Sequence, residues 1–148
     1  MYGYLMADTD ILIEIASHEF DAEKRYAEQI SRLCDGEVKQ LLAQLKDEKR
    51  QHKNECIVKI KALKADFNDK EFSAIDMDLN TLLCATLPEI IGYLEINEKN
   101  EAEAKTFLAD QLSNVEDAKI KEMIEIFSKN TIQHLESIAE LLRKERMD

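Results

Sequence analysis

Two stretches decide the fold of this chain: DGEVKQLLAQLKDEKRQH at residues 35–52 and DAKIKEMIEIFSKNTIQH at residues 117–134. Apolar residues recur in both at steps of three or four, which is typical of one face of an amphipathic helix. Both stretches begin with Asp and end with Gln-His, and they lie 82 positions apart. His52 and His134 fall on the apolar faces of these helices, where a polar side chain needs a partner.

The match extends beyond these two stretches. Residues 19–66 align with residues 101–148 without gaps, and ten of the 48 positions are identical. Helical periodicity explains the matching apolar positions, but it does not require identical polar residues on the inner face. Such identities pair Glu19 with Glu101 and His52 with His134. The sequence therefore predicts a duplicated helical hairpin.

The composition favours long helices, because the 148 residues include only three glycines and one proline. Apolar spacing predicts long helices over about 9–33, 37–64, 88–112 and 115–143. Residues 65–87 are too many for a tight turn, and we expect them to form a crossover with a short helical piece near 78–85. The expected fold is all-α: a single domain over residues 1–148, built as a four-helix bundle. Its two hairpins, at about 8–66 and 88–148, are joined by the crossover.

Local signals indicate where the helices begin and end. Asp8 or Thr9 can cap the first helix. Gly36 can end it in a left-handed conformation, since glycine adopts positive φ without steric cost. Pro88 suits the first turn of the third long helix.

Charge and cysteine usage restrict the partners and the location. The formal net charge of −11 argues against nucleic acid, and no apolar run is long enough to span a membrane. Cys34, Cys56 and Cys84 are odd in number and form no CxxC pair. Because the start of the chain also lacks an export signal, we expect a cytoplasmic protein with free thiols, in which Cys56 is a buried core residue.

The inward polar residues predict a site inside the bundle. Glu19, His52, Glu101 and His134, one from each long helix, can meet at its midpoint. Carboxylate oxygens and neutral imidazole nitrogens are suitable ligands for iron, manganese or zinc. A buried carboxylate without any partner is costly, so these glutamates require a cation or hydrogen-bond donors.

Together with EFDAEKRY (19–26) and EAEAKTFL (101–108), the two stretches resemble the rubrerythrin-type di-iron carboxylate proteins of the ferritin-like superfamily. The resemblance implies a non-haem iron oxidoreductase that reduces peroxide or oxygen, with an external electron donor, in a homodimer. It also implies that Glu19, His52, Glu101 and His134 are metal ligands. Tyr26 would lie beside the metal.

The chain departs from this family in its ligand set. The family carries Glu-x-x-His on its second and fourth helices, but Lys49 and Thr131 stand three residues before the two histidines. A rubredoxin-like tail is also missing. Glu48 or Glu55, each near His52 on its helix, are possible substitute ligands.

Two interpretations remain open from the sequence. In the first, an altered site holds iron, or manganese or zinc, as one ion or as a rebuilt pair. In the second, the Lys49 ammonium has replaced the metal and pairs with Glu19 or Glu101, and the protein has a non-catalytic structural or interaction role. Lys49 within about 3 Å of either carboxylate would favour the second interpretation. Asp21, Glu23 and Glu103 are expected to be solvated.

Overall fold

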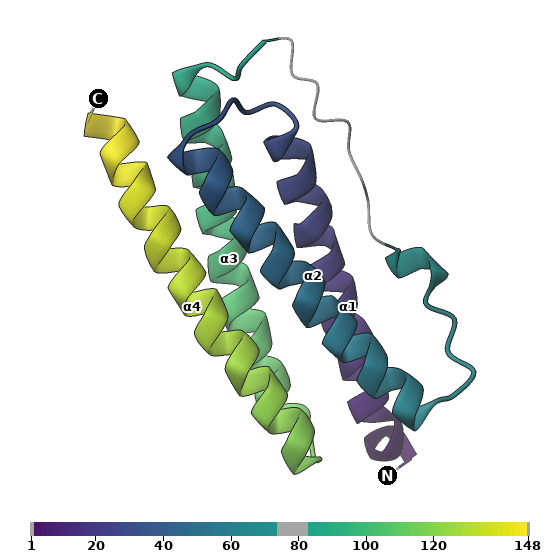
Figure 1. Cartoon of the computed structure of the whole chain (residues 1–148). Helices are drawn as coiled ribbons and strands as arrows, with labels where there is room; N and C mark the ends of the chain where they lie inside the picture. The colour runs from purple at the N-terminus through teal and green to yellow at the C-terminus, as the bar shows by residue number, and fades with distance from the viewer. Residues whose placement is uncertain (1, 74–82, 148) are drawn as a thin grey trace.

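The computed structural model describes residues 2–73 and 83–147, and it confirms the all-α four-helix architecture (Figure 1). The helices are α1 (Tyr2–Ile30), α2 (Glu37–Leu63), η1 (Lys70–Phe72), α3 (Leu87–Asn114) and α4 (Ala118–Met147). The described residues contain no strand. None of their helices is both long and apolar enough to cross a membrane.

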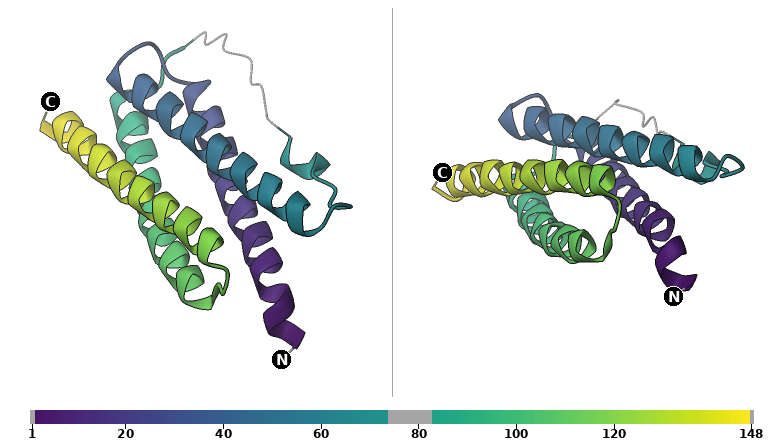
Figure 2. Two further views of the ribbon diagram at one scale, coloured as in Figure 1. Left: turned by 60° about the horizontal axis from the view of Figure 1, so that its bottom comes forward. Right: turned by 90° about the horizontal axis from the view of Figure 1, so that it is seen from below.

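The four long helices form two antiparallel hairpins, α1 with α2 and α3 with α4 (Figure 1). The crossover returns from the end of α2 to the start of α3, so α2 and α4 run in opposite directions along one side of the bundle (Figure 2). In the crossover, the short 3₁₀ helix η1 buries Phe72 against the α1–α2 hairpin. Most of the helical piece expected near 78–85 lies outside the described residues, and residues 83–86 are not helical.

Two of the expected helix-end signals are wrong. Helix α1 begins at Tyr2, so Asp8 lies inside it and does not cap it. The Asp8 carboxylate instead accepts hydrogen bonds from the backbone N–H groups of Glu116 and Asp117, both at 3.1 Å, and ties α1 to the α3–α4 turn. Gly36 is extended, with φ 160° and ψ −178°, because α1 has already ended at Ile30 and the connection needs no left-handed reversal.

The second hairpin begins with clear caps. The Thr86 hydroxyl accepts a hydrogen bond from the Glu89 N–H at 3.3 Å, and the Glu89 carboxylate accepts one from the Thr86 N–H at 2.9 Å. This reciprocal capping box, followed by Pro88, fixes the start of α3. Asp117 plays the same part for α4, since its carboxylate accepts the N–H groups of Lys119 and Ile120 at 2.9 and 3.0 Å.

The apolar core is divided into two clusters of buried side chains. One lies toward the α3–α4 turn and includes Leu12, Ile15, Cys56, Ile60, Leu108, Ile124 and Phe127. The other lies toward the α1–α2 loop and includes Tyr26, Ile30, Leu42, Leu45, Leu94, Ile138 and Leu142. Buried polar residues separate the two clusters at the middle of the bundle. They include the inward glutamates and histidines predicted from the sequence.

The expectation of three free thiols is wrong for two of them. Cys34 and Cys84 form a disulfide with a Cα–Cα distance of 5.3 Å, which joins the α1–α2 loop to the segment just before α3. The sequence could not indicate this pair, because the two cysteines are 50 residues apart and meet only when the crossover returns. The cytoplasmic location was expected partly because all three thiols were taken to be free. Since two of them form a disulfide, that argument no longer supports the location, which stays a prediction. Cys56 is free and buried, as expected, and burial raises the pKa of its thiol well above the ordinary value.

Reduction of the disulfide should lower the free energy of unfolding. Closing a loop of 50 residues stabilises a fold by about 4 kcal/mol, chiefly by restricting the unfolded chain. Urea unfolding with and without reductant measures the difference. The Cys34→Ser variant should match the reduced wild type and should not respond to reductant. Equal stability of the oxidised and reduced wild type would contradict the prediction.

Candidate functional site

The buried polar residues at the middle of the bundle form what we call the polar layer. Its members come from all four helices: Glu19 and Tyr26 from α1; Glu48, Lys49 and His52 from α2; Glu101 from α3; and Asn130, Thr131 and His134 from α4. The four ligand candidates predicted from the sequence are all buried and all lie in this layer. Of the two proposed substitutes, Glu48 belongs to the layer, whereas Glu55 is exposed on the outer side of α2.

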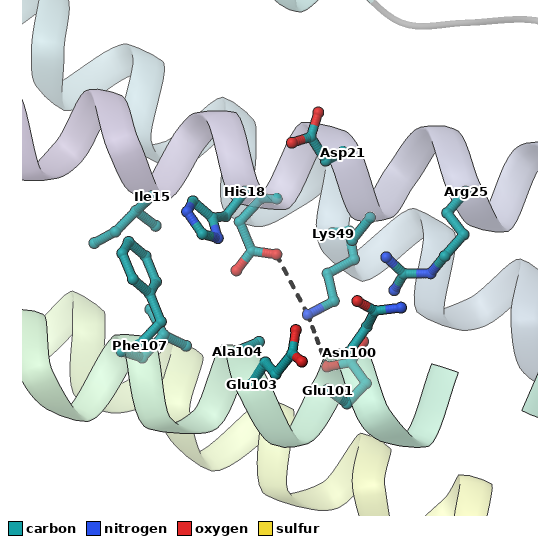
Figure 3. Close-up of a pocket in the computed structure, with 13 residues that line it drawn as sticks. Ile15, His18, Asp21, Arg25, Lys49, Asn100, Glu101, Glu103, Ala104 and Phe107 are labelled. Carbon is teal, nitrogen blue, oxygen red and sulfur yellow. Dashed lines mark hydrogen bonds and ion pairs between the residues drawn. The ribbon is translucent and has the colours of Figure 1, made fainter. Parts of the chain in front are cut away.

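The Lys49 ammonium is the centre of the polar layer. Its Nζ lies 3.0 Å from Glu101 Oε2 and 3.4 Å from Glu19 Oε2, between carboxylates from two different helices (Figure 3). The Lys49 side chain is only 2% exposed. Burial alone lowers the pKa of a lysine, but the two carboxylates outweigh it and raise the pKa of Lys49 above its ordinary value. Lys49 is therefore a charged ammonium inside the core.

The carboxylates of Glu19 and Glu101 are both held in the ionised form. Burial by itself raises the pKa of Glu101, but His134, the Lys49 ammonium and a 2.6 Å hydrogen bond from the Tyr26 hydroxyl outweigh it. Together they lower the pKa of Glu101 to about 2. Burial also raises the pKa of Glu19, yet Lys49 and a hydrogen bond from His52 bring it below the ordinary value.

His52 is satisfied at both ring nitrogens. Its Nδ1 lies 3.2 Å from Glu19 Oε1, and its Nε2 lies 2.9 Å from the side-chain nitrogen of Asn130. Because the Asn130 amide donates, Nε2 must accept, and the Nδ1–H then donates to Glu19. This arrangement fits a neutral imidazole, whose ring stacks on Phe127 with centroids 4.1 Å apart.

His134 is satisfied at only one nitrogen. Its Nε2 lies 2.8 Å from Glu48 Oε2, and the Glu48 side chain is 31% exposed. Its Nδ1 lies 3.8 Å from Glu101 Oε2, beyond hydrogen-bond range, and is buried without a hydrogen-bond partner among the described residues. The ring therefore connects a carboxylate that reaches solvent with one inside the core.

The contacts of the two histidines follow the sequence repeat. Glu48 and Asn130 are equivalent positions, 82 apart, and each contacts the histidine of the other hairpin. The two halves of the sequence repeat differ at positions 49 and 131, where one has Lys49 and the other has Thr131. The Thr131 hydroxyl donates to the Phe127 carbonyl at 2.8 Å in its own helix, so it takes no part in the charge network.

A second buried ionic group was not expected. Glu23 is fully buried, although the sequence indicated a solvated position. Its carboxylate accepts from Lys53 Nζ at 2.7 Å and from Arg50 Nε at 2.8 Å. The signal that could have revealed this group is the spacing of Lys49 and Lys53, which places both on the face of α2 that carries His52.

Asn97 is another buried polar residue that the sequence did not single out. It accepts a hydrogen bond from Arg25 at 3.0 Å and donates one to Gln29 at 2.7 Å, so it links α3 to α1 next to the polar layer. Asn97 lies one helical turn before Glu101, whereas its repeat equivalent is Ile15. The repeat therefore gave no indication of a polar residue here.

A cavity of about 260 Å³ lies between α1 and α3 and reaches Lys49 (Figure 3). It exists because Ala22 and Ala104, which are repeat equivalents, present only methyl groups where the helices face each other. At one end the His18 and Phe107 rings stack with centroids 4.0 Å apart. His18 is exposed, as are Asp21 and Glu103, which were expected to be solvated.

The side chains do not fit a di-iron centre. Among residues 2–73 and 83–147, no group of three or more His, Cys, Asp or Glu side chains is arranged to hold a metal ion. The physical reason is that Lys49 places a positive charge between Glu19 and Glu101, and Thr131 supplies no carboxylate.

Comparison with known proteins adds no relatives: no protein-family model, no curated protein and no solved structure matches the chain significantly. The all-α four-helix fold is shown by the structure, while the resemblance to rubrerythrins stays a prediction.

Replacing Lys49 should be strongly destabilising. The Lys49→Met variant leaves two buried carboxylates without their cation, and loss of one partner of a buried ion pair costs about 3–5 kcal/mol. Lys61→Met is the matched control in the same helix, because it removes an exposed ion pair with Asp69, and exposed pairs contribute little to stability. Urea unfolding at neutral pH measures both. If Lys49→Met does not fold, Lys49→Met with Glu101→Gln should recover folding, since one carboxylate is then neutral.

Acid should destabilise the protein through Glu101. A carboxyl with a lowered pKa in the folded state adds stability above its unfolded pKa and loses it as the pH falls toward its folded pKa. The window for Glu101 therefore runs from about 4.5 down to about 2, and the loss is about 3 kcal/mol. Unfolding free energies between pH 7 and 3 should fall less steeply for Glu101→Gln than for wild type. The control variant Glu103→Gln, changed at an exposed neighbouring position, should follow wild type. If the unfolding free energy of wild type and both variants falls equally steeply with pH, Glu101 is not the group responsible for the acid sensitivity.

Proposed function

We propose that this protein is a ferritin-like helical bundle in which Lys49 takes the place of the metal, and that it has a non-catalytic structural or interaction role. The observation that carries the proposal is the Lys49 ammonium at 3.0 and 3.4 Å from the two glutamates that the family would use as ligands. An ammonium neutralises buried carboxylates as a cation does, but it offers no open coordination position and no redox state.

The hydrogen bonds of the polar layer support this proposal. Each of the four carboxylate oxygens of Glu19 and Glu101 already has a donor within 3.4 Å, from Lys49, His52 or Tyr26. A metal would have to displace an ammonium whose pKa is raised by those same carboxylates. Buried polar groups that are hydrogen-bonded in this way favour one packing arrangement of the helices, and His134 Nδ1 is the exception in the layer.

The layer's contacts also indicate what such a network does. Lys49 joins α2 to α3, Tyr26 joins α1 to α3, and Asn130 joins α4 to α2. These bonds run between the two hairpins rather than within them. The polar layer therefore fixes how the hairpins are set against each other, which suits a protein that presents a fixed surface.

One observation favours a second candidate, a single metal ion at the His134 end of the layer. His134 Nδ1 is buried, lacks a hydrogen-bond partner among the described residues and faces Glu101. His134 Nδ1 and Glu101 would be the groups to hold such an ion, since Glu48 contacts the other ring nitrogen of His134. Bound there, a redox-active metal would supply electron-transfer chemistry that the side chains lack.

Ferrous iron titration separates the two candidates. Wild type should show no saturable iron binding, and its melting temperature should be the same with and without a chelator. The Lys49→Glu, Thr131→Glu double variant restores the Glu-x-x-His pattern on both helices and should bind iron stoichiometrically. A control with the same change in charge, Lys61→Glu with Gln133→Glu, alters only exposed positions and should not bind iron.

Two outcomes would overturn the proposal. Saturable iron binding by wild type, lost in His134→Gln, would establish the single-metal candidate instead. Equal iron binding by the restored variant and the control would show that the polar layer is not the place where a metal site was lost.

A further inference from the structure

A basic pocket lies between α2 and the crossover, away from the polar layer. After α2 ends, the chain turns back so that η1 lies beside the first hairpin (Figure 1). The pocket between them has a volume of about 410 Å³. Its charged lining residues are four cations, Arg50, Lys53, Lys61 and Lys70, and one anion, Asp69. This excess of positive charge runs against the formal net charge of the chain, which is −11.

We propose that this pocket binds a small organic phosphate, namely a phosphate monoester whose organic part is apolar. Such binding goes beyond the proposed function, because no residue of the polar layer lines the pocket. The charge balance of the pocket, its open hydrogen-bond donors and its apolar wall each point to this class of ligand.

The buried Glu23 carboxylate positions two of the four cations. Its Oε1 accepts from Lys53 Nζ at 2.7 Å, and its Oε2 accepts from Arg50 Nε at 2.8 Å. One negative charge is therefore shared by two positive charges. The Lys53 side chain is buried, whereas the Arg50 side chain is 30% exposed. Glu23 thus holds the Arg50 guanidinium in a fixed place on the wall of the pocket.

The carboxylates around the pocket neutralise only half of its cations. The Lys61 ammonium pairs with the Asp69 carboxylate at 3.0 Å, which ties the crossover to α2. Lys70 has no ion-pair partner within the described part of the chain. Four cations set against the carboxylates of Glu23 and Asp69 leave a net charge of +2. A phosphate monoester carries about −1.5 to −2 at neutral pH, so its charge matches this excess.

Several donors at the pocket have no acceptor among the residues that the structure describes. Arg50 uses only its Nε–H, so its other guanidinium N–H groups are available to a ligand. The Asn54 amide, one turn further along α2, and the Lys70 ammonium are available in the same way. A guanidinium presents its N–H groups in a fork that matches phosphate oxygens. Because Glu23 already orders Arg50, binding costs little side-chain entropy there.

The remaining wall of the pocket is apolar. Ile57 and Phe72 are buried side chains of the lining, and Val58 is 71% exposed. Phe72 is held in place by the ring of Phe20, whose centroid lies 5.9 Å away. An organic group placed against Val58 would remove its apolar surface from water. The pocket therefore favours an organic phosphate over inorganic phosphate, since small-molecule sites combine an apolar wall with a few orienting polar groups.

The pocket belongs to the first hairpin alone. Ile132 and Leu135 stand 82 positions after Arg50 and Lys53, so the second hairpin has no cations at the equivalent places. The sequence repeat that underlies the polar layer therefore gives no reason for these two cations. A role confined to the first hairpin, such as binding an anion, accounts for them.

Isothermal titration calorimetry of the full chain with phenyl phosphate tests the site. At neutral pH and low ionic strength, wild type should bind one phenyl phosphate per chain. Inorganic phosphate should bind more weakly, because it leaves the apolar wall uncovered. Phenol, which has the ring but no phosphate, should show no saturable binding.

Three variants locate the phosphate. Lys70→Gln changes an exposed residue without a described ion-pair partner and should raise the dissociation constant for phenyl phosphate on the order of 10-fold. Arg50→Gln should raise it on the order of 100-fold, while Glu23 keeps Lys53 as its partner. Lys99→Gln is the matched control: it makes the same change in charge at an exposed position of α3 outside the pocket, and should bind like wild type.

Val58→Ser tests the apolar wall separately. It should weaken the binding of phenyl phosphate and leave the affinity for inorganic phosphate unchanged, because only the organic group contacts this side chain. Circular dichroism of each variant checks that the helices are intact.

Three results would contradict the proposal. Wild type without saturable binding of phenyl phosphate would exclude the site, and an equal loss of affinity in Lys70→Gln and Lys99→Gln would show attraction to the whole surface instead. Inorganic phosphate that binds as tightly as phenyl phosphate would exclude an organic ligand. None of these measurements involves iron or the polar layer, so the pocket and the proposed function can fail independently.

Discussion

The structure depends on one buried cation. The Lys49 ammonium lies between Glu19 and Glu101 in the middle of the bundle, and the three side chains are at most 5% exposed. Removing Lys49 leaves two buried carboxylates without their cation, and removing both glutamates leaves the ammonium without an anion. Replacing the whole group by apolar residues could give a bundle of equal stability, since buried ion pairs add little net free energy. The bonds of Glu101 to Lys49 and Tyr26 link the second hairpin to the first.

The sequence repeat between the two hairpins parallels the symmetry of the polar layer, and the layer's one exception lies where the repeat differs. Glu48 and Asn130 each contact Nε2 of the histidine in the other hairpin, and Ala22 and Ala104 line the single cavity between α1 and α3. Lysine and threonine at positions 49 and 131 then differentiate the halves. One hairpin supplies the central cation, and the other supplies a hydroxyl that turns back to its own helix. A symmetric framework thus carries an asymmetric charge arrangement.

Helical periodicity was sufficient to predict the four helices and the burial of Glu19, His52, Glu101 and His134, because an inward position is a property of a single helix. It was not sufficient for Glu23 and Lys53, because a charged residue at the edge of the apolar face becomes buried only when the neighbouring helix covers it. The disulfide escaped prediction for the same kind of reason: its formation depends on where a long connection ends. Contacts between distant segments are the information that periodicity lacks.

The disulfide also determines how tension would travel through the molecule. A pulling force applied at the two ends of the chain enters the α1–α2 loop at Cys34 and leaves just before α3 at Cys84. The covalent bond transmits that force directly, so the intervening residues, including the whole of α2, are shielded from extension. Lys49 lies on α2, while its glutamate partners lie on α1 and α3, which bear the load. Stretching the chain would therefore move the Glu19 and Glu101 carboxylates away from the Lys49 ammonium, because α1 and α3 bear the force and α2 does not.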